Sequence, residues 1–152
     1  MIYIIEDNIL KSEQIIDFLN AKFNLDEKEV SVFMSFQSGL KAIESKLPRM
    51  VILDMTLPTF DRKPNAREGR LRPLGGYDLM RKMALKGLKC QVIVVTQLES
   101  FGDGEDEIGF DEITEKCSSE FPDLFVGSVY FDQGGVTWRG SLESMIIKTS
   151  GG

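Results

Sequence analysis

The chain has 152 residues, and its 42% of apolar and 28% of charged residues are typical of one globular domain rather than of a disordered protein. A formal net charge of −6 argues against nucleic-acid binding, because affinity for phosphates depends on clustered Lys and Arg. The absence of histidine excludes the usual zinc sites and every catalytic pair built on histidine.

The first apolar run, residues 2–5, ends abruptly in Glu6 and Asp7 and predicts a buried strand. Asn8 then suits the N-cap of an amphipathic helix whose apolar residues recur every four positions, with the polar residues elsewhere around the turn. The apolar face comprises Ile15, Ile16, Leu19 and Phe23, and the polar residues are Lys11, Glu13, Gln14 and Lys22.

A second strand is expected at residues 30–36, where apolar and polar side chains alternate. Ser38 suits the N-cap of the next helix, which ends before Pro48. The third strand, residues 50–53, is apolar on both faces and ends in Asp54. Like the first strand, it carries an acid at its carboxyl end.

Two long segments without apolar periodicity are expected to be loops, at about residues 58–76 and 97–109. The first is rich in Pro, Gly and basic residues, and the second is acidic. Solvated loops are one interpretation, while mutual docking or recruitment of a partner is the other, since loops of more than about 12 to 15 residues in a compact domain are often functional. The basic residues of the first loop are Arg62, Lys63, Arg67, Arg70 and Arg72.

Three helices and two strands complete the pattern. A helix containing Met83 ends at Gly87, a fourth buried strand ends in Thr96, and the fifth strand covers residues 124–131, with a helix before it and another after it.

Strands that alternate with helices predict an α/β fold: a doubly wound, five-stranded parallel sheet of flavodoxin-like order 2-1-3-4-5 with helices on both faces. We assign residues 1–148 to this domain and 149–152 to a flexible tail.

In such a sheet the carboxyl ends of strands one, three and four lie at one edge. The sequence therefore predicts that Glu6, Asp7, Asp54 and Thr96 lie close together. Neighbouring carboxylates repel and raise one another's pKa unless they share a cation, and oxygen ligands of this kind suit Mg²⁺. We expect a Mg²⁺ site at this edge.

Three segments that carry these residues resemble the receiver domains of two-component response regulators. Residues 4–8 (IIEDN) resemble the acidic pair of that family, residues 51–58 (VILDMTLP) its phosphoacceptor segment, and residues 92–96 (VIVVT) the strand that ends in its switch threonine. The segments have the order and separation found in the family, and the resemblance in fold covers nearly the whole chain.

The resemblance implies that Asp54 accepts a phosphoryl group from a histidine kinase or phosphotransfer protein. Mg²⁺ would be held by Asp7, Asp54 and the backbone carbonyl of Thr56, with Glu6 acting through water. The hydroxyl of Thr96 would then turn toward the phosphoryl oxygens.

An aromatic side chain on the fifth strand, Tyr130 or Phe131, would rotate inward at the same time and alter the surface that a downstream protein binds. The chain departs from the family after this strand, where receivers usually carry a lysine. No lysine occurs between Lys116 and Lys148.

We expect Arg70 and Arg72 of the basic loop to contact the phosphoryl group instead, since guanidinium groups suit phosphate oxygens. The competing expectation is that the acidic loop holds these arginines away from the site.

The leading hypothesis is a single-domain receiver in the cytoplasm that binds neither nucleic acid nor membrane and performs no catalysis beyond phosphorylation and dephosphorylation at Asp54. The alternative is a pseudo-receiver, an interaction module independent of phosphorylation, which is favoured by the missing lysine and by bulky Gln97 after the switch threonine. A third hypothesis, a phosphatase of the haloacid dehalogenase type, requires a second aspartate where this chain has Thr56.

Overall fold

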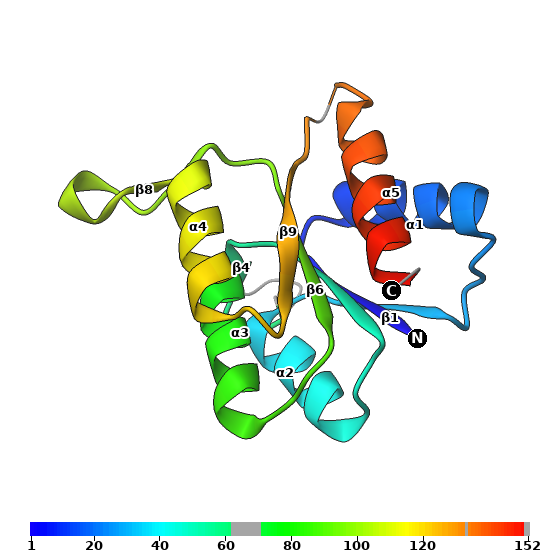
Figure 1. Cartoon of the computed structure of the whole chain (residues 1–152), viewed down its shortest axis with the longest axis horizontal. Coiled ribbons are helices and arrows are strands. Elements are labelled where there is room, and N and C mark those ends of the chain that lie inside the picture. Colours follow the sequence, from blue (N-terminus) through cyan, green and yellow to red (C-terminus); the bar gives the residue numbers. More distant parts are fainter. Residues whose placement is uncertain (62–70, 133, 151–152) are drawn as a thin grey trace.

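The structure is a computed structural model and describes residues 1–61, 71–132 and 134–150. Its centre is a five-stranded parallel sheet of order β2-β1-β3-β6-β9 (Figure 1), which confirms the predicted order because the other strands are short additions outside this sheet. The five strands are β1 (Ile2–Ile5), β2 (Val30–Phe33), β3 (Met50–Leu53), β6 (Gln91–Thr96) and β9 (Phe125–Tyr130).

Helices cover both faces of the sheet, as predicted (Figure 1). On one face lie α1 (Ile9–Phe23) and α5 (Thr137–Ser150). On the other lie α2 (Phe36–Ser45), α3 (Gly75–Lys86) and α4 (Phe110–Glu120). None of the described helices is long and apolar enough to cross a membrane.

Two hydrophobic clusters follow from the alternation of side chains along the strands. Ile5 and Leu53 belong to the cluster beneath α2, α3 and α4, whereas Ile4 and Ile52 belong to the cluster beneath α1 and α5. All four side chains are buried. Burial on both faces explains why the central strands appear in the sequence as continuous apolar runs.

The second strand ends earlier than the sequence predicts. Ser35 is the N-cap of α2, and its hydroxyl accepts a hydrogen bond of 3.1 Å from the backbone N–H of Ser38. The predicted cap at Ser38 is therefore wrong: this residue completes a capping box by accepting a 3.2 Å bond from the N–H of Ser35. Phe36, expected in the strand, is the first helical residue and is buried.

Both segments that were expected to be loops contain short antiparallel strand pairs. β4 (Leu57–Pro58) pairs with β5 (Leu71–Arg72), which brings the two ends of the first segment together. β7 (Ser100–Phe101) pairs with β8 (Ile108–Gly109) in a hairpin that projects from the body of the domain (Figure 1). A short 3₁₀ turn, Gly104–Asp106, lies at its tip.

Candidate functional site

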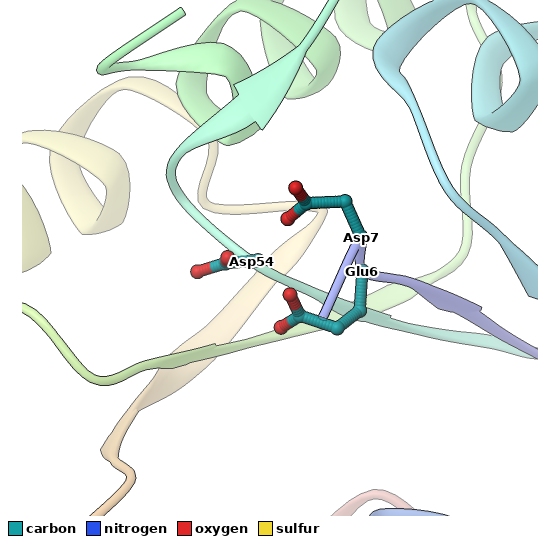
Figure 2. Close-up of side chains that lie close together, drawn as sticks. All are labelled: Glu6, Asp7 and Asp54. Atoms are coloured by element: carbon teal, nitrogen blue, oxygen red, sulfur yellow. The ribbon is translucent and has the colours of Figure 1, made fainter. Parts of the chain in front are cut away.

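Three carboxylates meet at the carboxyl ends of β1 and β3 (Figure 2). Glu6 and Asp7 follow β1 directly and Asp54 follows β3, and oxygen atoms of the three side chains lie within 4.8 Å of one another. The strands are paired in register, and the N–H of Asp54 donates a 3.0 Å hydrogen bond to the carbonyl of Ile5. The predicted convergence of these acids is confirmed.

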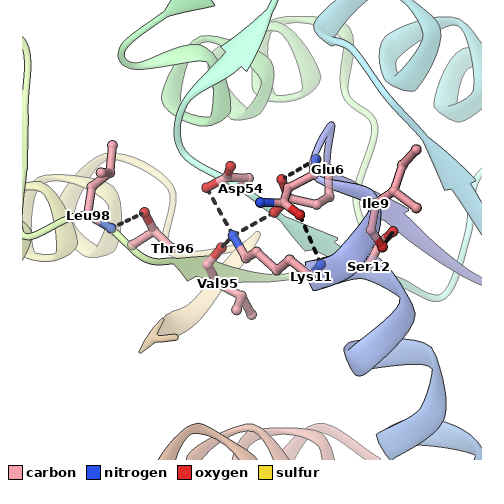
Figure 3. Close-up of polar contacts among 9 residues, drawn as sticks. Glu6, Ile9, Lys11, Ser12, Asp54, Val95, Thr96 and Leu98 are labelled. Atoms are coloured by element: carbon pink, nitrogen blue, oxygen red, sulfur yellow. Dashed lines mark hydrogen bonds and ion pairs between the residues drawn. The ribbon is translucent and has the colours of Figure 1, made fainter. Parts of the chain in front are cut away.

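A buried lysine from the first turn of α1 lies among these acids (Figure 3). The Nζ atom of Lys11 is 2.5 Å from Oε1 of Glu6 and 3.4 Å from Oδ1 of Asp54. It also donates a hydrogen bond of 2.8 Å to the carbonyl oxygen of Val95, near the end of β6. Only 2% of the Lys11 side chain is exposed. The cluster thus contains its own positive charge, which reduces the repulsion among the carboxylates.

The expectation that Lys11 lies on the polar face of its helix is wrong. Lys11 is one turn before Ile15 and two turns before Leu19, and all three residues are buried. Residues at i, i+4 and i+8 share one face of a helix. This spacing was the signal that could have found Lys11, because it places the lysine at the end of the apolar stripe nearest the predicted acids.

Local hydrogen bonds hold Lys11 and Glu6 in place. As predicted, Asn8 is the N-cap of α1, and its side chain accepts a 3.1 Å bond from the backbone N–H of Lys11. The N–H of Asn8 in turn donates a 3.0 Å bond to Oε2 of Glu6. The short connection from β1 to α1 therefore fixes the carboxylate of Glu6 and the backbone from which the Lys11 side chain extends.

Burial dominates the electrostatics of the cluster. Loss of hydration and, next in size, the nearby charge of Asp54 raise the pKa of Glu6 to about 8, although Lys11 opposes the shift. Burial likewise raises the pKa of Asp54, and again Lys11 opposes the shift. A hard cation would lower the cost of keeping these groups ionised, and carboxylate oxygens are the donors that Mg²⁺ prefers. The donor set thus fits Mg²⁺.

A glycine in α3 determines how closely that helix approaches the site. A Cβ atom at Gly76 would lie 2.6 Å from the carbonyl oxygen of Asp54 and 3.1 Å from Cα of Met55. The N–H of Gly76 also donates a 2.8 Å hydrogen bond to the carbonyl of Met55. Only glycine allows this approach, so α3 supports the backbone of Asp54 directly. From the sequence, Gly76 was expected only as a loop residue.

The other predicted site residues lie around this centre. The hydroxyl of buried Thr96 accepts a 3.3 Å hydrogen bond from the N–H of Leu98 (Figure 3). Tyr130 lies opposite Thr96 on β9, is 42% exposed and contacts Phe110 edge to face. Phe131 is buried instead. Of the two aromatic candidates, only Tyr130 has an exposed position from which to move.

Thr56 was expected to offer its backbone carbonyl to a metal ion. Its side chain is occupied elsewhere, because the hydroxyl donates a 3.0 Å hydrogen bond to the carbonyl of Pro73. This bond ties the segment after Asp54 to the turn that leads into α3. Metal binding through the Thr56 carbonyl stays a prediction.

Arg72 contacts side chains beside the site. Its guanidinium lies 4.2 Å from the ring centre of Phe36, donates a 3.1 Å hydrogen bond from Nε to Thr59, and is 3.6 Å from a carboxylate oxygen of Asp78. Arg70 and residues 62–69 of the basic loop lie outside the described residues, as do residues 151–152 of the predicted tail. The predicted contacts of Arg70 and Arg72 with a phosphoryl group stay predictions.

The two long segments face each other across a pocket of about 600 Å³. Thr59, Leu71 and Arg72 line it from the first segment, and Asp103 and Asp106 line it from the second. Opposite charges therefore border the same pocket, and both interpretations of the loops stay open.

No protein-family profile matches the chain. The Detocs response regulatory protein DtcB of Enterobacter cloacae (strain JD6301) is 32% identical over 149 residues, which is 97% of this chain and 98% of the relative. A protein of the same name from Vibrio alginolyticus is 23% identical over 133 residues, 87% of this chain and 89% of the relative.

Solved structures of other proteins have the same fold as this chain. A DNA-binding response regulator of the LuxR family from Staphylococcus aureus has a TM-score of 0.61 at 18% identity, covering 97% of this chain and 96% of that one. The receiver domain of Francisella response regulator 1452 has a TM-score of 0.55 at 14% identity, with coverage of 98% and 95%. With the sequence relatives, these similarities show that the chain belongs to the family of response regulatory proteins that includes DtcB, and that its fold is that of a receiver domain.

Proposed function

We propose that this receiver accepts a phosphoryl group on Asp54 from a partner histidine kinase or phosphotransfer protein and relays the signal by changing its contacts with a downstream protein. The observation that carries the proposal is the cluster of Glu6, Asp7 and Asp54, with oxygens within 4.8 Å of one another at the carboxyl edge of the sheet. Lys11 adds a positive charge to the same cluster.

In the proposed reaction, a carboxylate oxygen of Asp54 forms a bond to phosphorus, while the bond from phosphorus to the donor breaks and its electron pair leaves with the donor. Asp7, Asp54 and the carbonyl of Thr56 would hold Mg²⁺, and Glu6 would act through water. When bound, Mg²⁺ neutralises charge on the transferring oxygens. The protein itself contributes position, because α3 and β3 hold the backbone of Asp54.

The relay step follows from the residues next to the site. The hydroxyl of Thr96 would give up the hydrogen bond that it accepts from the Leu98 N–H and would donate one to a phosphoryl oxygen. Tyr130, opposite Thr96 on β9, would leave its edge-to-face contact with Phe110 and turn inward. The surface made by α4, β9 and α5 would change shape and bind a different protein partner.

This function involves no catalytic output beyond phosphorylation and dephosphorylation at Asp54. It places the protein in the cytoplasm with a kinase, and requires neither nucleic acid nor membrane.

A second candidate function is supported by the ion pairs of Lys11. Because Lys11 already contacts Glu6 and Asp54, the cluster is partly neutralised without a metal ion. A pseudo-receiver would keep such a cluster for structural reasons and would bind its partner in one unchanging form.

The experiment that separates the two functions is incubation with Mg²⁺ and acetyl phosphate, followed by intact mass spectrometry. The receiver function predicts one added phosphoryl group in the wild-type protein and none in Asp54→Asn or in the presence of EDTA. A wild-type protein that gains no phosphoryl group from acetyl phosphate or phosphoramidate would favour the pseudo-receiver.

A further inference from the structure

The lysine that receivers usually carry after the last strand is missing here, yet an ammonium group lies at the carboxyl edge of the sheet. We propose that Lys11 of α1 is the residue that contacts the phosphoryl group on Asp54 and stabilises its transfer, in place of a lysine after β9. The inference rests on the proposed function and assigns one further catalytic residue to it.

The position of the ammonium is close to the place where a lysine after β9 would enter the site. Nζ of Lys11 bonds to the carbonyl of Val95, which is paired with Val129 on β9. The same Nζ lies 5.7 Å from the ring centre of Phe131, the residue that directly follows β9. A cation from the first helix therefore reaches the end of the fifth strand of the main sheet.

The three contacts of this ammonium are unequal. An ammonium has three N–H donors. Those toward Glu6 and Val95 make short contacts of 2.5 and 2.8 Å, whereas Asp54 is 3.4 Å away. Two contacts orient the group, and the longer one points to the carboxylate that would be phosphorylated. This third contact can shorten when negative charge on Asp54 increases.

The charge change on phosphorylation favours such a response. Transfer replaces the single negative charge of the Asp54 carboxylate with a phosphoryl group that carries more negative charge. The ammonium of Lys11 needs only to shorten its contact with the oxygens on Asp54, which now lies at 3.4 Å. With 2% of the side chain exposed, little water competes for the ammonium, and its attraction to the phosphoryl oxygens is correspondingly strong.

Arg72 is the competing cation among the described residues. Its guanidinium already contacts Phe36, Thr59 and Asp78. Lys11, in contrast, contacts Asp54 directly. If Lys11 contacts the phosphoryl group, its substitution should slow phosphorylation, whereas substitution of Arg72 should not.

The first test compares the rates at which Lys11→Met and Lys22→Met are phosphorylated by acetyl phosphate with Mg²⁺. Lys22 is an exposed lysine in the last turn of the same helix and serves as the control. We expect Lys11→Met to react on the order of 100-fold more slowly, the scale found when one electrostatic donor is removed from an active site. Its Mg²⁺ affinity should be equal or higher, because a competing positive charge is gone. Lys22→Met should match the wild type.

The outcomes separate this inference from the function on which it rests. If the wild type is phosphorylated on Asp54 and Lys11→Met reacts as fast, the role of Lys11 is wrong while the receiver function stands. If the wild type is not phosphorylated at all, both are wrong.

A crystal structure of the wild-type protein with Mg²⁺ and beryllofluoride, which imitates a phosphoryl group, gives a test that needs no variant to fold. We expect Nζ of Lys11 within hydrogen-bond distance of a fluoride. A fluoride contacted by Arg70 or Arg72 while Lys11 stays on Glu6 and Val95, or failure of the wild type to bind beryllofluoride, would overturn the proposal.

Discussion

The Nζ atom of Lys11 donates a 2.8 Å hydrogen bond to the carbonyl oxygen of Val95, which lies 84 residues further along the chain. This bond joins the first turn of α1 to the end of β6, on the edge of the sheet where Glu6 and Asp54 also lie. A buried charge with several partners is costly to disturb, because loss of one partner leaves the others without compensation. The stability of the domain and the chemistry of its site should therefore depend on the same few groups.

The first prediction concerns pH. The pKa of Glu6 in the folded protein is about 8, above its ordinary value of 4.5, so between these values the folded state binds a proton that the unfolded state does not. The free energy of unfolding in metal-free buffer should therefore fall as pH rises through this range. The raised pKa of Asp54 acts in the same direction. Urea unfolding in the presence of EDTA at several pH values measures how steeply the free energy of unfolding depends on pH.

Glu6→Gln is the matched variant for this prediction, since the amide imitates the protonated acid. Its free energy of unfolding should depend less on pH than that of the wild type. Stability that rises between these pH values, or a slope that Glu6→Gln leaves unchanged, would contradict the assignment.

The second prediction concerns Mg²⁺. The wild type should bind the ion weakly, and Asp7→Asn and Asp54→Asn should each lose most of this binding, because each removes a charged oxygen ligand. Asp17→Asn, an exposed acid on α1, is the control and should bind as the wild type does. NMR titrations that follow the amide chemical shifts measure the Mg²⁺ affinity of all four proteins. Full affinity in both site variants would show that the ion binds elsewhere.

The third prediction concerns the support of Asp54 by α3. Gly76→Ala places a methyl group against the backbone of Asp54 and Met55 and should lower the free energy of unfolding by about 1–3 kcal/mol, as overpacking does. It should also slow phosphorylation, because the backbone of the acceptor must shift. Gly140→Ala is the control: Gly140 lies exposed in α5 with open space around it, and alanine there should stabilise by about 0.5–1 kcal/mol. Equal stability of the two variants would show that α3 has room at this point.

The fourth prediction concerns Arg72. Its contacts with Phe36, Thr59 and Asp78 suggest that it braces β5 against α2 and α3, so Arg72→Ala should destabilise the domain by about 1 kcal/mol and leave the phosphorylation rate unchanged. Arg49→Ala, at an exposed position before β3, is the control for loss of charge. Slower phosphorylation at unchanged thermal stability would instead support the contact with the phosphoryl group expected from the sequence.

The sheet and its acids were predictable because their signals are local. Strands buried on both faces appear as continuous apolar runs, and an acid that ends such a run marks the carboxyl edge. Glu6, Asp7 and Asp54 could be brought together from strand order alone.

Lys11 was missed for the opposite reason. A lysine in a helix is usually solvated, and its burial depends on partners that only the fold supplies. Glu6 and Asp54 become those partners once β1 and β3 pair. The predicted strand end at Phe36 was wrong for a similar reason. The alternation of apolar and polar residues continues from β2 into α2, and the hydrogen bonds between Ser35 and Ser38 that mark the start of α2 form only in the folded chain.

The central claim is that Asp54 accepts a phosphoryl group, and ³¹P NMR of the protein with Mg²⁺ and phosphoramidate tests it most directly. The account predicts one acyl-phosphate resonance in the wild-type protein that is absent from Asp54→Asn and does not form when EDTA is present before phosphoramidate is added. No such resonance in the wild type, or an equal one in Asp54→Asn, would contradict it.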